Sequence, residues 1–348
     1  MIREALVDVV AGKALGFERA HDTMGEIMDG GATPAQIAAF LVALRMKGES
    51  ADEIAGMAVA MRERCARIVG PANGRLVDLC GTGGAPLRTF NVSTIAMFVV
   101  AGAGVTVAKH GNRAVTSACG SADLLEALGV RVDLDPSEVQ RVLDTTGLCF
   151  MFAPKFHPAM RHAVGPRKEI GIRTVFNILG PLTNPAGAKG HVLGVSSPDL
   201  VELLPGVAAR LGMERVLVVH GTAGVDEICT CCPTLVGEVK DGSTKRYVMT
   251  PRDLGMTRSS PEALAGADPA TSAVEALKLL RGAKGAKRDM ILANAAAGIY
   301  VAGKADSLRE AVGPAQDSLE SGAAYDRLID LVRATGGDLS KVEGDGRA

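Results

Sequence analysis

LVDLCGTGGAPLRTFNVST occupies residues 76–94 and decides the fold. The apolar run from Leu76 to Cys80 predicts a strand that ends at the glycines 81, 83 and 84, and the run from Ser93 to Ala103 predicts a helix. Because glycine carries no side chain, backbone N–H groups can crowd around an anion at this turn, and the helix start adds its positive end. The stretch therefore predicts a strand, a phosphate-binding loop and a helix.

Two commoner phosphate motifs are excluded here. A dinucleotide-binding fingerprint would need glycine where Pro86 stands and an acid about 20 residues later, yet the next predicted strand ends in Lys109. A P-loop would need Gly-Lys-Ser/Thr, which the stretch lacks. A tight glycine turn without a ligand is the alternative.

The surrounding sequence predicts an α/β protein with a helical unit in front. Capping boxes at Thr33 and Ser50 each begin a helix with apolar residues on one face. After Gly70-Pro71, short apolar runs alternate with helical stretches, which is typical of a largely parallel sheet. Further strands are predicted at Val105 to Ala108, Val192 to Val195, Val216 to His220 and Arg246 to Met249. Further helices are predicted at Ala122 to Leu128, Pro136 to Thr145 and Asp199 to Leu211.

We expect a small helical domain joined to a larger α/β domain with a mostly parallel central sheet. The helical domain is predicted at residues 1–69, with a returning segment at about 160–187. The α/β domain is predicted at residues 70–159 and 188–335, and residues 336–348 are expected to form a loose tail. The segment from Pro154 to Pro185, dense in Pro, His and Arg, is expected to link the two units and contribute to the site in the cleft.

The amino-acid composition indicates which kinds of molecule this protein binds. The 348 residues carry a formal charge of -1, which gives no general attraction to nucleic acid and favours a small molecule. The longest apolar run, about 95–107, is too short for a membrane span of about 20 residues, and the start MIREALVDVV lacks the order of a signal peptide. We therefore expect a cytoplasmic protein.

Seven cysteines argue against a disulfide framework, and Cys229, Cys231 and Cys232 are interpreted as buried, inert thiols rather than a metal site.

Polar residues follow the second predicted strand, where residues 109–113 read KHGNR. The carboxyl ends of parallel strands share one edge of a sheet, so Lys109, His110 and Asn112 should face the same crevice as the glycine loop. Lys109 and Arg113 beside that loop favour more than one phosphate. Ser117 and the GSAD at 120–123 begin the next helix and can hold a phosphate or cap the helix. A solvated turn is the alternative for KHGNR.

Two acids follow the strand VLVVHG, in the sequence GVDE. Magnesium takes one or two carboxylates together with substrate phosphates, so Asp226 and Glu227 favour a magnesium site. Neighbours on a regular strand point to opposite faces, so joint ligation requires a bend. An exposed acidic turn is the alternative.

The stretch FAPKFHPAMRHAVGPRKEIGIRT, residues 152–174, precedes FNILGPLTNP. His157, Met160, Arg167 and Arg173 combine apolar surface with cations, as a pocket for an aromatic carboxylate requires, because arginine offers a bidentate fork. Docking of the two units is the alternative role.

Taken together, GTGG with NVST, KHGNR, GSADLLEALG, HPAMRH, FNILGPLTNP and GVDE resemble the anthranilate phosphoribosyltransferase family, over about residues 5–335. Class II nucleoside phosphorylases, which are related, lack KHGNR and GPLTNP. The resemblance implies transfer of the 5-phosphoribosyl group of PRPP to the amine of anthranilate, the second step of tryptophan biosynthesis from chorismate. It further implies a phosphoribosyl-binding α/β domain, a homodimer formed through the helical domains, and Mg²⁺, two ions per active site.

The same resemblance implies roles for individual residues. PRPP binding falls on Gly81, Thr82, Gly83, Gly84, Thr89, Asn91, Val92, Ser93, Thr94, Lys109, His110, Gly111, Asn112, Ser117 and Ser121. Anthranilate binding falls on Gly81, His110, Asn112, His157, Met160, Arg167 and Gly180. The implied catalytic residues are Lys109 and Arg167, and the implied metal ligands are Ser93, Asp226 and Glu227. One position departs from the family, because Ala85 and then Pro86 follow GTGG where many members have an acid.

Two rival functions stay open at this point. A nucleoside phosphorylase of related fold would use free phosphate and a nucleoside. A non-catalytic relative could use the same scaffold to bind nucleic acid, although the near-neutral charge disfavours it.

Overall fold

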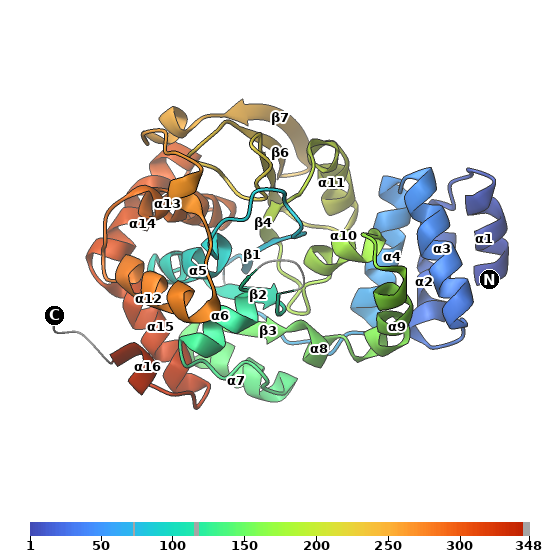
Figure 1. Ribbon diagram of the computed structural model, residues 1–348, viewed down its shortest axis with the longest axis horizontal. Coiled ribbons are helices and arrows are strands. Elements are labelled where there is room, and N and C mark those ends of the chain that lie inside the picture. Colours follow the sequence, from blue (N-terminus) through green and yellow to red (C-terminus); the bar gives the residue numbers. More distant parts are fainter. Residues whose placement is uncertain (72–73, 115–117, 344–348) are drawn as a thin grey trace.

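The computed structural model describes residues 1–71, 74–114 and 118–343. Figure 1 shows a helical bundle beside the N-terminus at one end of the long axis, and a sheet with its covering helices toward the other end. In the described part of the chain, no helix is long and apolar enough to cross a membrane.

The N-terminal bundle contains four helices: α1 (Ile2–Val10), α2 (Gly16–Met28), α3 (Pro34–Lys47) and α4 (Ala51–Glu63). Both predicted capping boxes are confirmed. Thr33 Oγ1 accepts a hydrogen bond from the Gln36 N–H at 3.3 Å, and Ser50 Oγ accepts one from the Glu53 N–H at 3.2 Å. These caps satisfy backbone donors that the first helical turn leaves without partners, so α3 and α4 begin where the sequence predicts.

One seven-stranded sheet forms the body of the larger part. Its strands are β1 (Val77–Gly81), β2 (Val107–Gly111), β3 (Leu148–Phe152), β4 (Gly190–Gly194), β5 (Arg215–Gly221), β6 (Thr234–Lys240) and β7 (Ser243–Met249). The spatial order is β3-β2-β1-β4-β5-β6-β7, with parallel pairing from β3 to β5 and antiparallel pairing from β5 to β7. The predicted α/β class with a mostly parallel sheet is confirmed. Connections leave β1 and β4 toward opposite sides, and such a switch point is where open α/β sheets bind ligands.

Two strands were not predicted from the sequence, β3 and β6. β3 follows helix α7 after a single residue, Gly147, whose φ of 69° ends the helix in the left-handed conformation. β6 contains Gly237, where a Cβ would lie 2.5 Å from the Val201 carbonyl oxygen of the covering helix. Both strands do have turn signals beside them, because Gly147 precedes β3 and Asp241-Gly242 joins β6 to β7, so both could have been predicted.

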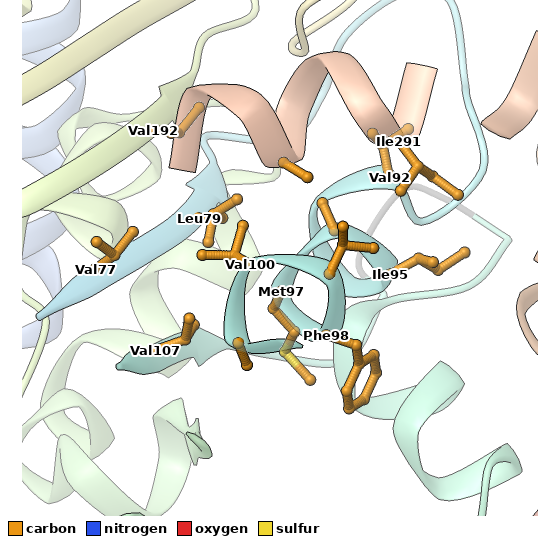
Figure 2. Packing of buried hydrophobic residues seen from close by; sticks show 14 of the residues in the cluster. Val77, Leu79, Val92, Ile95, Met97, Phe98, Val100, Val107, Val192 and Ile291 are labelled. Carbon is orange, nitrogen blue, oxygen red and sulfur yellow. The ribbon is translucent and has the colours of Figure 1, made fainter. Parts of the chain in front are cut away.

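Helices cover both faces of the sheet. They are α5 (Val92–Gly102), α6 (Ser121–Ala127), α7 (Pro136–Thr146), α11 (Pro198–Arg210), α12 (Pro269–Leu280), α13 (Ala286–Val301), α14 (Leu308–Glu320) and α15 (Ala323–Ala334). Single turns of 3-10 helix lie at Pro158–Met160, Pro251–Leu254 and Glu262–Leu264. Figure 2 shows α5 packed between β1, β2 and α13, where Met97, Val100 and Ile291 are buried. This packing fixes the start of α5 at the carboxyl edge of the sheet.

The segment expected to link the two parts forms helices α8 (Ala153–Phe156), α9 (Arg161–Ile170) and α10 (Val175–Leu182). Buried side chains of α9 and α10, including Ala163 and Leu179, belong to the same hydrophobic cluster as the N-terminal bundle. The cluster continues into Val216 and Val218 of the sheet, so the two parts of the chain share one packed interior at this junction.

The expectation of a loose tail from residue 336 is wrong for part of that segment. Residues Ser340–Glu343 form a short helix, α16, and Val342 is fully buried. The Val342 carbonyl oxygen accepts hydrogen bonds from Arg281 Nη2 and from the Tyr325 hydroxyl, both at 2.7 Å. An apolar side chain and two donors on neighbouring helices therefore hold residues 340–343 in place.

Candidate active site

A cavity of about 620 Å³ lies at the carboxyl ends of β1 and β2. It is lined by the glycine loop, by residues around the start of α5, by the end of β2 and by the acidic bend after β5. The residues predicted for the site that line it are Gly81, Thr82, Gly83, Gly84, Thr89, Asn91, Ser93, Thr94, Lys109, His110, Gly111, Asn112, Ser121, Asp226 and Glu227. The structure thus brings most of the predicted site into one cavity.

The glycine loop needs its glycines for conformation and for space. Gly83 and Gly84 have φ of 62° and 75°, in the left-handed region that favours glycine. A Cβ on Gly84 would overlap the guanidinium of Arg173. Arg173 Nη1 donates a hydrogen bond to the Gly83 carbonyl oxygen at 2.7 Å, and its other nitrogen donates to Ser196 Oγ at 3.2 Å. Arg173 therefore holds the loop while its charge faces the cavity.

The acid pair Asp226 and Glu227 lies in a bend, as joint ligation requires. Burial raises the pKa of Asp226, and burial together with the Asp226 charge raises the pKa of Glu227 to about 8. The backbone N–H of Gly83 stabilises charged Asp226, and that of Ser93 stabilises charged Glu227, so these donors partly offset the effect of burial. The pair thus faces both the glycine loop and the start of α5.

Gly194, at the end of β4, makes room for the acidic bend. A Cβ on Gly194 would overlap the Asp226 carbonyl oxygen, and a Cβ on Gly81 would lie 3.0 Å from Asp226 Oδ2. Gly194 also accepts the hydrogen bond from the Thr82 N–H, at 2.8 Å, that continues β1 into the loop. Two strands therefore end in glycine where the acid pair must approach.

Lys109 points from β2 across the end of β1. Its side chain is almost fully buried, and Nζ donates to the Leu79 carbonyl oxygen and to Ser93 Oγ, the latter at 3.2 Å. The Lys109 charge also favours ionisation of Glu227. Lys109 therefore places a fixed positive charge between the acid pair and the start of α5.

Arg113 does not supply the second free cation that KHGNR suggested. Its Nη2 donates to Glu126 at 2.8 Å, and its Nη1 lies 3.3 Å from Asp123, both on the next helix. The guanidinium also lies 5.4 Å from the centre of the Phe152 ring. Arg113 lines the cavity, but its charge is neutralised by its own neighbours.

His110 and His157 form a neutral pair beside the cavity. Their ring centres lie 5.0 Å apart, and His110 Nδ1 lies 3.2 Å from the Gly180 carbonyl oxygen. Burial, aided by His157, lowers the pKa of His110 to about 3, and burial lowers the pKa of His157 to about 4. Nε2 of each ring is buried without a hydrogen-bond partner among the described residues. Both imidazoles can therefore hydrogen-bond to a neutral polar group.

Several predicted residues lie outside this cavity. His157, Met160, Arg167 and Gly180 do not line it, although His157 and Gly180 contact His110, which does. Val92 is 1% exposed, and its side chain packs in the apolar core around α5, as Figure 2 shows. Only its backbone can serve the site. Ser117 lies outside the described residues.

Arg167 lies on α9, half-buried, with its guanidinium carbon 4.9 Å from the centre of the Phe176 ring. Burial lowers the pKa of this arginine. No acidic group of the described residues contributes to this shift, so no carboxylate is paired with Arg167. A stacked arginine with no acidic partner suits an external carboxylate.

Sequence reasoning missed Arg88, Asn177 and Gly194. Arg88 and Asn177 line the cavity. Asn177 also accepts the hydrogen bond from the Thr174 N–H at 2.9 Å, so its capping pattern was the visible signal. Gly194 carries no sequence signal of its own, because its role depends on a bend 32 residues later.

Two family models match this chain. The "Glycosyl transferase family, helical bundle domain" matches residues 3–65, and the "Glycosyl transferase family, a/b domain" matches residues 73–325. The chain is 52% identical over 336 residues to the anthranilate phosphoribosyltransferase of Pelotomaculum thermopropionicum, with 97% of each chain covered.

Solved structures agree with this match. The anthranilate phosphoribosyltransferase of Thermus thermophilus superposes with a TM-score of 0.90 at 45% identity, covering 95% of this chain and 99% of that one. The Saccharomyces cerevisiae enzyme in complex with PRPP and Mg gives a TM-score of 0.87 at 27% identity, covering 96% and 98%. With this similarity along nearly the whole length, the chain belongs to the anthranilate phosphoribosyltransferase family.

Proposed function

We propose that this protein transfers the 5-phosphoribosyl group of PRPP to the amine of anthranilate, giving N-(5-phosphoribosyl)anthranilate and pyrophosphate. The bond from ribose C1 to a pyrophosphate oxygen breaks, and a bond from the anthranilate nitrogen to C1 forms. The amine proton leaves to solvent or to the pyrophosphate. Positive charge builds on the sugar and negative charge on the leaving group, so the protein must above all hold the pyrophosphate.

The observation that carries the proposal is the convergence of Gly83, Lys109 and Glu227 on one cavity. Lys109 supplies a fixed positive charge, and the glycine loop supplies backbone N–H groups free of side chains. This arrangement suits a diphosphate that gains charge as it leaves.

Magnesium fits the donor set at the acid pair. Ser93, Asp226 and Glu227 offer only oxygen atoms, which Mg²⁺ prefers, and they lie at the same wall of the cavity. Burial raises the pKa values of both acids, and the Asp226 charge raises that of Glu227 further. No cationic side chain of the described residues is hydrogen-bonded to either acid. Bound Mg²⁺ would neutralise charge on the leaving pyrophosphate. We propose these three residues as its ligands, for two ions per site.

The acceptor is proposed to lie on the side of the cavity where His110 is found. His110 and Asn112 line the cavity, and His157 and Arg167 lie on the segment beyond it. Neutral His110 and His157 can bind the amine, and Arg167 can pair with the carboxylate. Their task is to hold a weakly nucleophilic amine in line with C1. No strong base is required, because the amine can lose its proton late in the reaction.

The experiment that tests this function is a fluorescence assay of anthranilate loss in the presence of PRPP and Mg²⁺. We expect anthranilate to disappear with equal production of pyrophosphate. Anthranilate that stays constant while a nucleoside is cleaved by free phosphate would establish the phosphorylase instead. A salt-dependent shift of DNA mobility without turnover would establish the nucleic-acid-binding alternative.

We also propose the domain division, the dimer and the cytoplasmic location implied by the sequence. Packing of α9 and α10 on the N-terminal bundle supports a returning segment at about 160–187. Val7 and Val10 on α1, and Met46 on α3, are 69%, 71% and 83% exposed, which supports a contact between helical domains. Light scattering tests this, because Val10→Glu should shift a dimer toward monomer while Val248→Glu on β7 should not.

A further inference from the structure

Three cysteines gather on the connection between β5 and β6, directly after the acid pair. Cys229, Cys231 and Cys232 are 2%, 2% and 4% exposed, and their sulfur atoms all lie within 4.8 Å of one another. The sulfur atoms of Cys229 and Cys231 are 2.8 Å apart. Three thiols therefore lie together in the interior, two of them in hydrogen-bond contact.

Backbone donors are directed at two of these sulfur atoms. The Cys231 N–H donates to Cys229 Sγ at 3.2 Å, and the Ala223 N–H donates to Cys232 Sγ at 3.3 Å. Such N–H groups stabilise negative charge on sulfur, and metal ligands are commonly held by outer donors of this kind. Gly221 leaves room for the cluster, because a Cβ there would lie 3.0 Å from Cys229 Cβ and 3.3 Å from Cys232 Sγ.

In place of the inert thiols expected from the sequence, we propose that Cys229, Cys231 and Cys232 form a binding site for a soft monovalent cation, Cu(I), held by three thiolates. Soft sulfur ligands select Cu(I) or Zn²⁺ over the hard Mg²⁺. A structural Zn²⁺ site takes four ligands, and in the described part of the chain no histidine or carboxylate joins this group of three. Each ligating thiol releases its proton to solvent, and the copper keeps its oxidation state.

The site would fix the connection that carries the acid pair. Asn294 of α13 already holds Ile228 with two hydrogen bonds, from the Ile228 N–H at 3.0 Å and to the Ile228 carbonyl oxygen at 2.9 Å. A cation at the cysteines adds a second anchor only two residues from Glu227. Because the cation binds the folded chain, it should raise the melting temperature by about 2 °C or more.

The test is an anaerobic titration of the fully reduced protein with Cu(I) held by a coloured chelator. We expect the protein to remove one equivalent of Cu(I) per chain. Cys229→Ser, Cys231→Ser and Cys232→Ser should each weaken the affinity by more than about 100-fold, since losing even an outer-shell partner costs about 10- to 100-fold. Cys65→Ser, in the bend just after α4, is the matched control and should bind as the wild type does.

Cys80→Ser tests whether copper binds at a different group of buried side chains. Cys80 lies within 4.8 Å of the ligand atoms of Asp78 and His191, a second buried group of three. Asp78 already accepts hydrogen bonds there from Asn184 at 2.7 Å and from the His110 N–H at 3.2 Å. Copper binding that is lost in Cys80→Ser, or that survives the triple Cys229, Cys231 and Cys232 to serine change, would overturn the proposal.

If the serine variants fail to fold, X-ray absorption of the copper-loaded wild-type protein tests the site instead. The spectrum should show three sulfur neighbours around the copper. Nitrogen or oxygen neighbours, or no copper retained after desalting, would overturn the proposal. So would Zn²⁺ that displaces equimolar Cu(I).

Discussion

The two edges of the sheet each carry a cavity, and they differ in how their charges are satisfied. The cavities at the amino and carboxyl edges have similar volumes, about 670 and 620 Å³. The charged residues at the amino edge are paired, because Glu214 lies 3.0 Å from Arg75 and 2.9 Å from Lys189. At the carboxyl edge, Asp226 and Glu227 have raised pKa values, and no Lys or Arg of the described residues is hydrogen-bonded to them. Buried acids without a cationic partner, rather than cavity size, mark the edge where a metal ion and its ligand should bind.

The largest expected effect comes from removing the acid pair. Asp226→Asn with Glu227→Gln should lower kcat by about 10³-fold or more, because a bound metal contributes several kcal/mol to such a reaction. Glu214→Gln at the amino edge is the matched control and should keep kcat within about twofold. Steady-state assays over a range of Mg²⁺ concentrations measure both, and a normal magnesium response in the double variant would remove the pair from the site.

Lys109 comes next. Lys109→Met keeps an unbranched apolar side chain, one atom shorter, but removes the charge, and kcat should fall by about 10²- to 10³-fold, as for loss of one donor to a developing anion. Lys189→Met, which breaks a paired charge at the other edge, should leave kcat unchanged. Equal losses of kcat in Lys109→Met and Lys189→Met would mean that the charge at the carboxyl edge is no more important for catalysis than the charge at the amino edge.

Gly194→Ala tests the space that the acidic bend needs. The added Cβ would overlap the Asp226 carbonyl oxygen, so the bend must move, and kcat/KM should fall by about 100-fold, as a 1 Å displacement can cause. Gly313→Ala on α14, where a Cβ would meet nothing within 4 Å, is the control and should stabilise the helix slightly. Wild-type kcat/KM in Gly194→Ala would show that the bend tolerates displacement.

The sequence predicts those features of the site that depend on residues close together in the chain. The strand, the glycine turn and the following helix were predicted because each depends on residues next to one another. The meeting of Lys109 with the glycine loop followed from a general rule of parallel sheets and is confirmed.

Residues whose state depends on distant partners were missed or misjudged. Arg113 was counted as a free cation, but Glu126 from the following helix pairs with it. Gly194 went unnoticed, because its neighbour Asp226 is brought to it only by the fold. Arg173 was noted for its charge, whereas its hydrogen bonds to the glycine loop arise from the packing of α9 and α10 beside the sheet.

Arg167→Ala tests the acceptor side of the carboxyl edge. Loss of a charged hydrogen-bonding partner costs about 1.5–3 kcal/mol, so the KM for anthranilate should rise by about 10- to 100-fold while the KM for PRPP stays nearly constant. Arg161→Ala, an exposed arginine on the same helix, should change neither value. An unchanged KM for anthranilate in Arg167→Ala would refute its pairing with the carboxylate.

The smallest effect concerns stability in acid. Burial lowers the pKa of His157 from 6.5 to about 4, so the unfolded chain takes up this proton first, and stability is lost as the pH falls from about 6.5 to 4. His157→Gln removes this contribution. The loss in unfolding free energy between pH 7 and pH 5 should then be smaller by about 2 kcal/mol, as measured in urea. His162→Gln, on the following helix α9, is the control. An unchanged loss in His157→Gln would contradict a neutral buried imidazole.

The most direct test of the account is a crystal structure with PRPP and Mn²⁺, which replaces Mg²⁺ and gives an anomalous signal. We expect a manganese peak beside Glu227 and Asp226, with the diphosphate of PRPP between the glycine loop and Lys109. Manganese and diphosphate bound at the amino edge, or in two separate cavities, would contradict the claim that these groups converge to hold one leaving group.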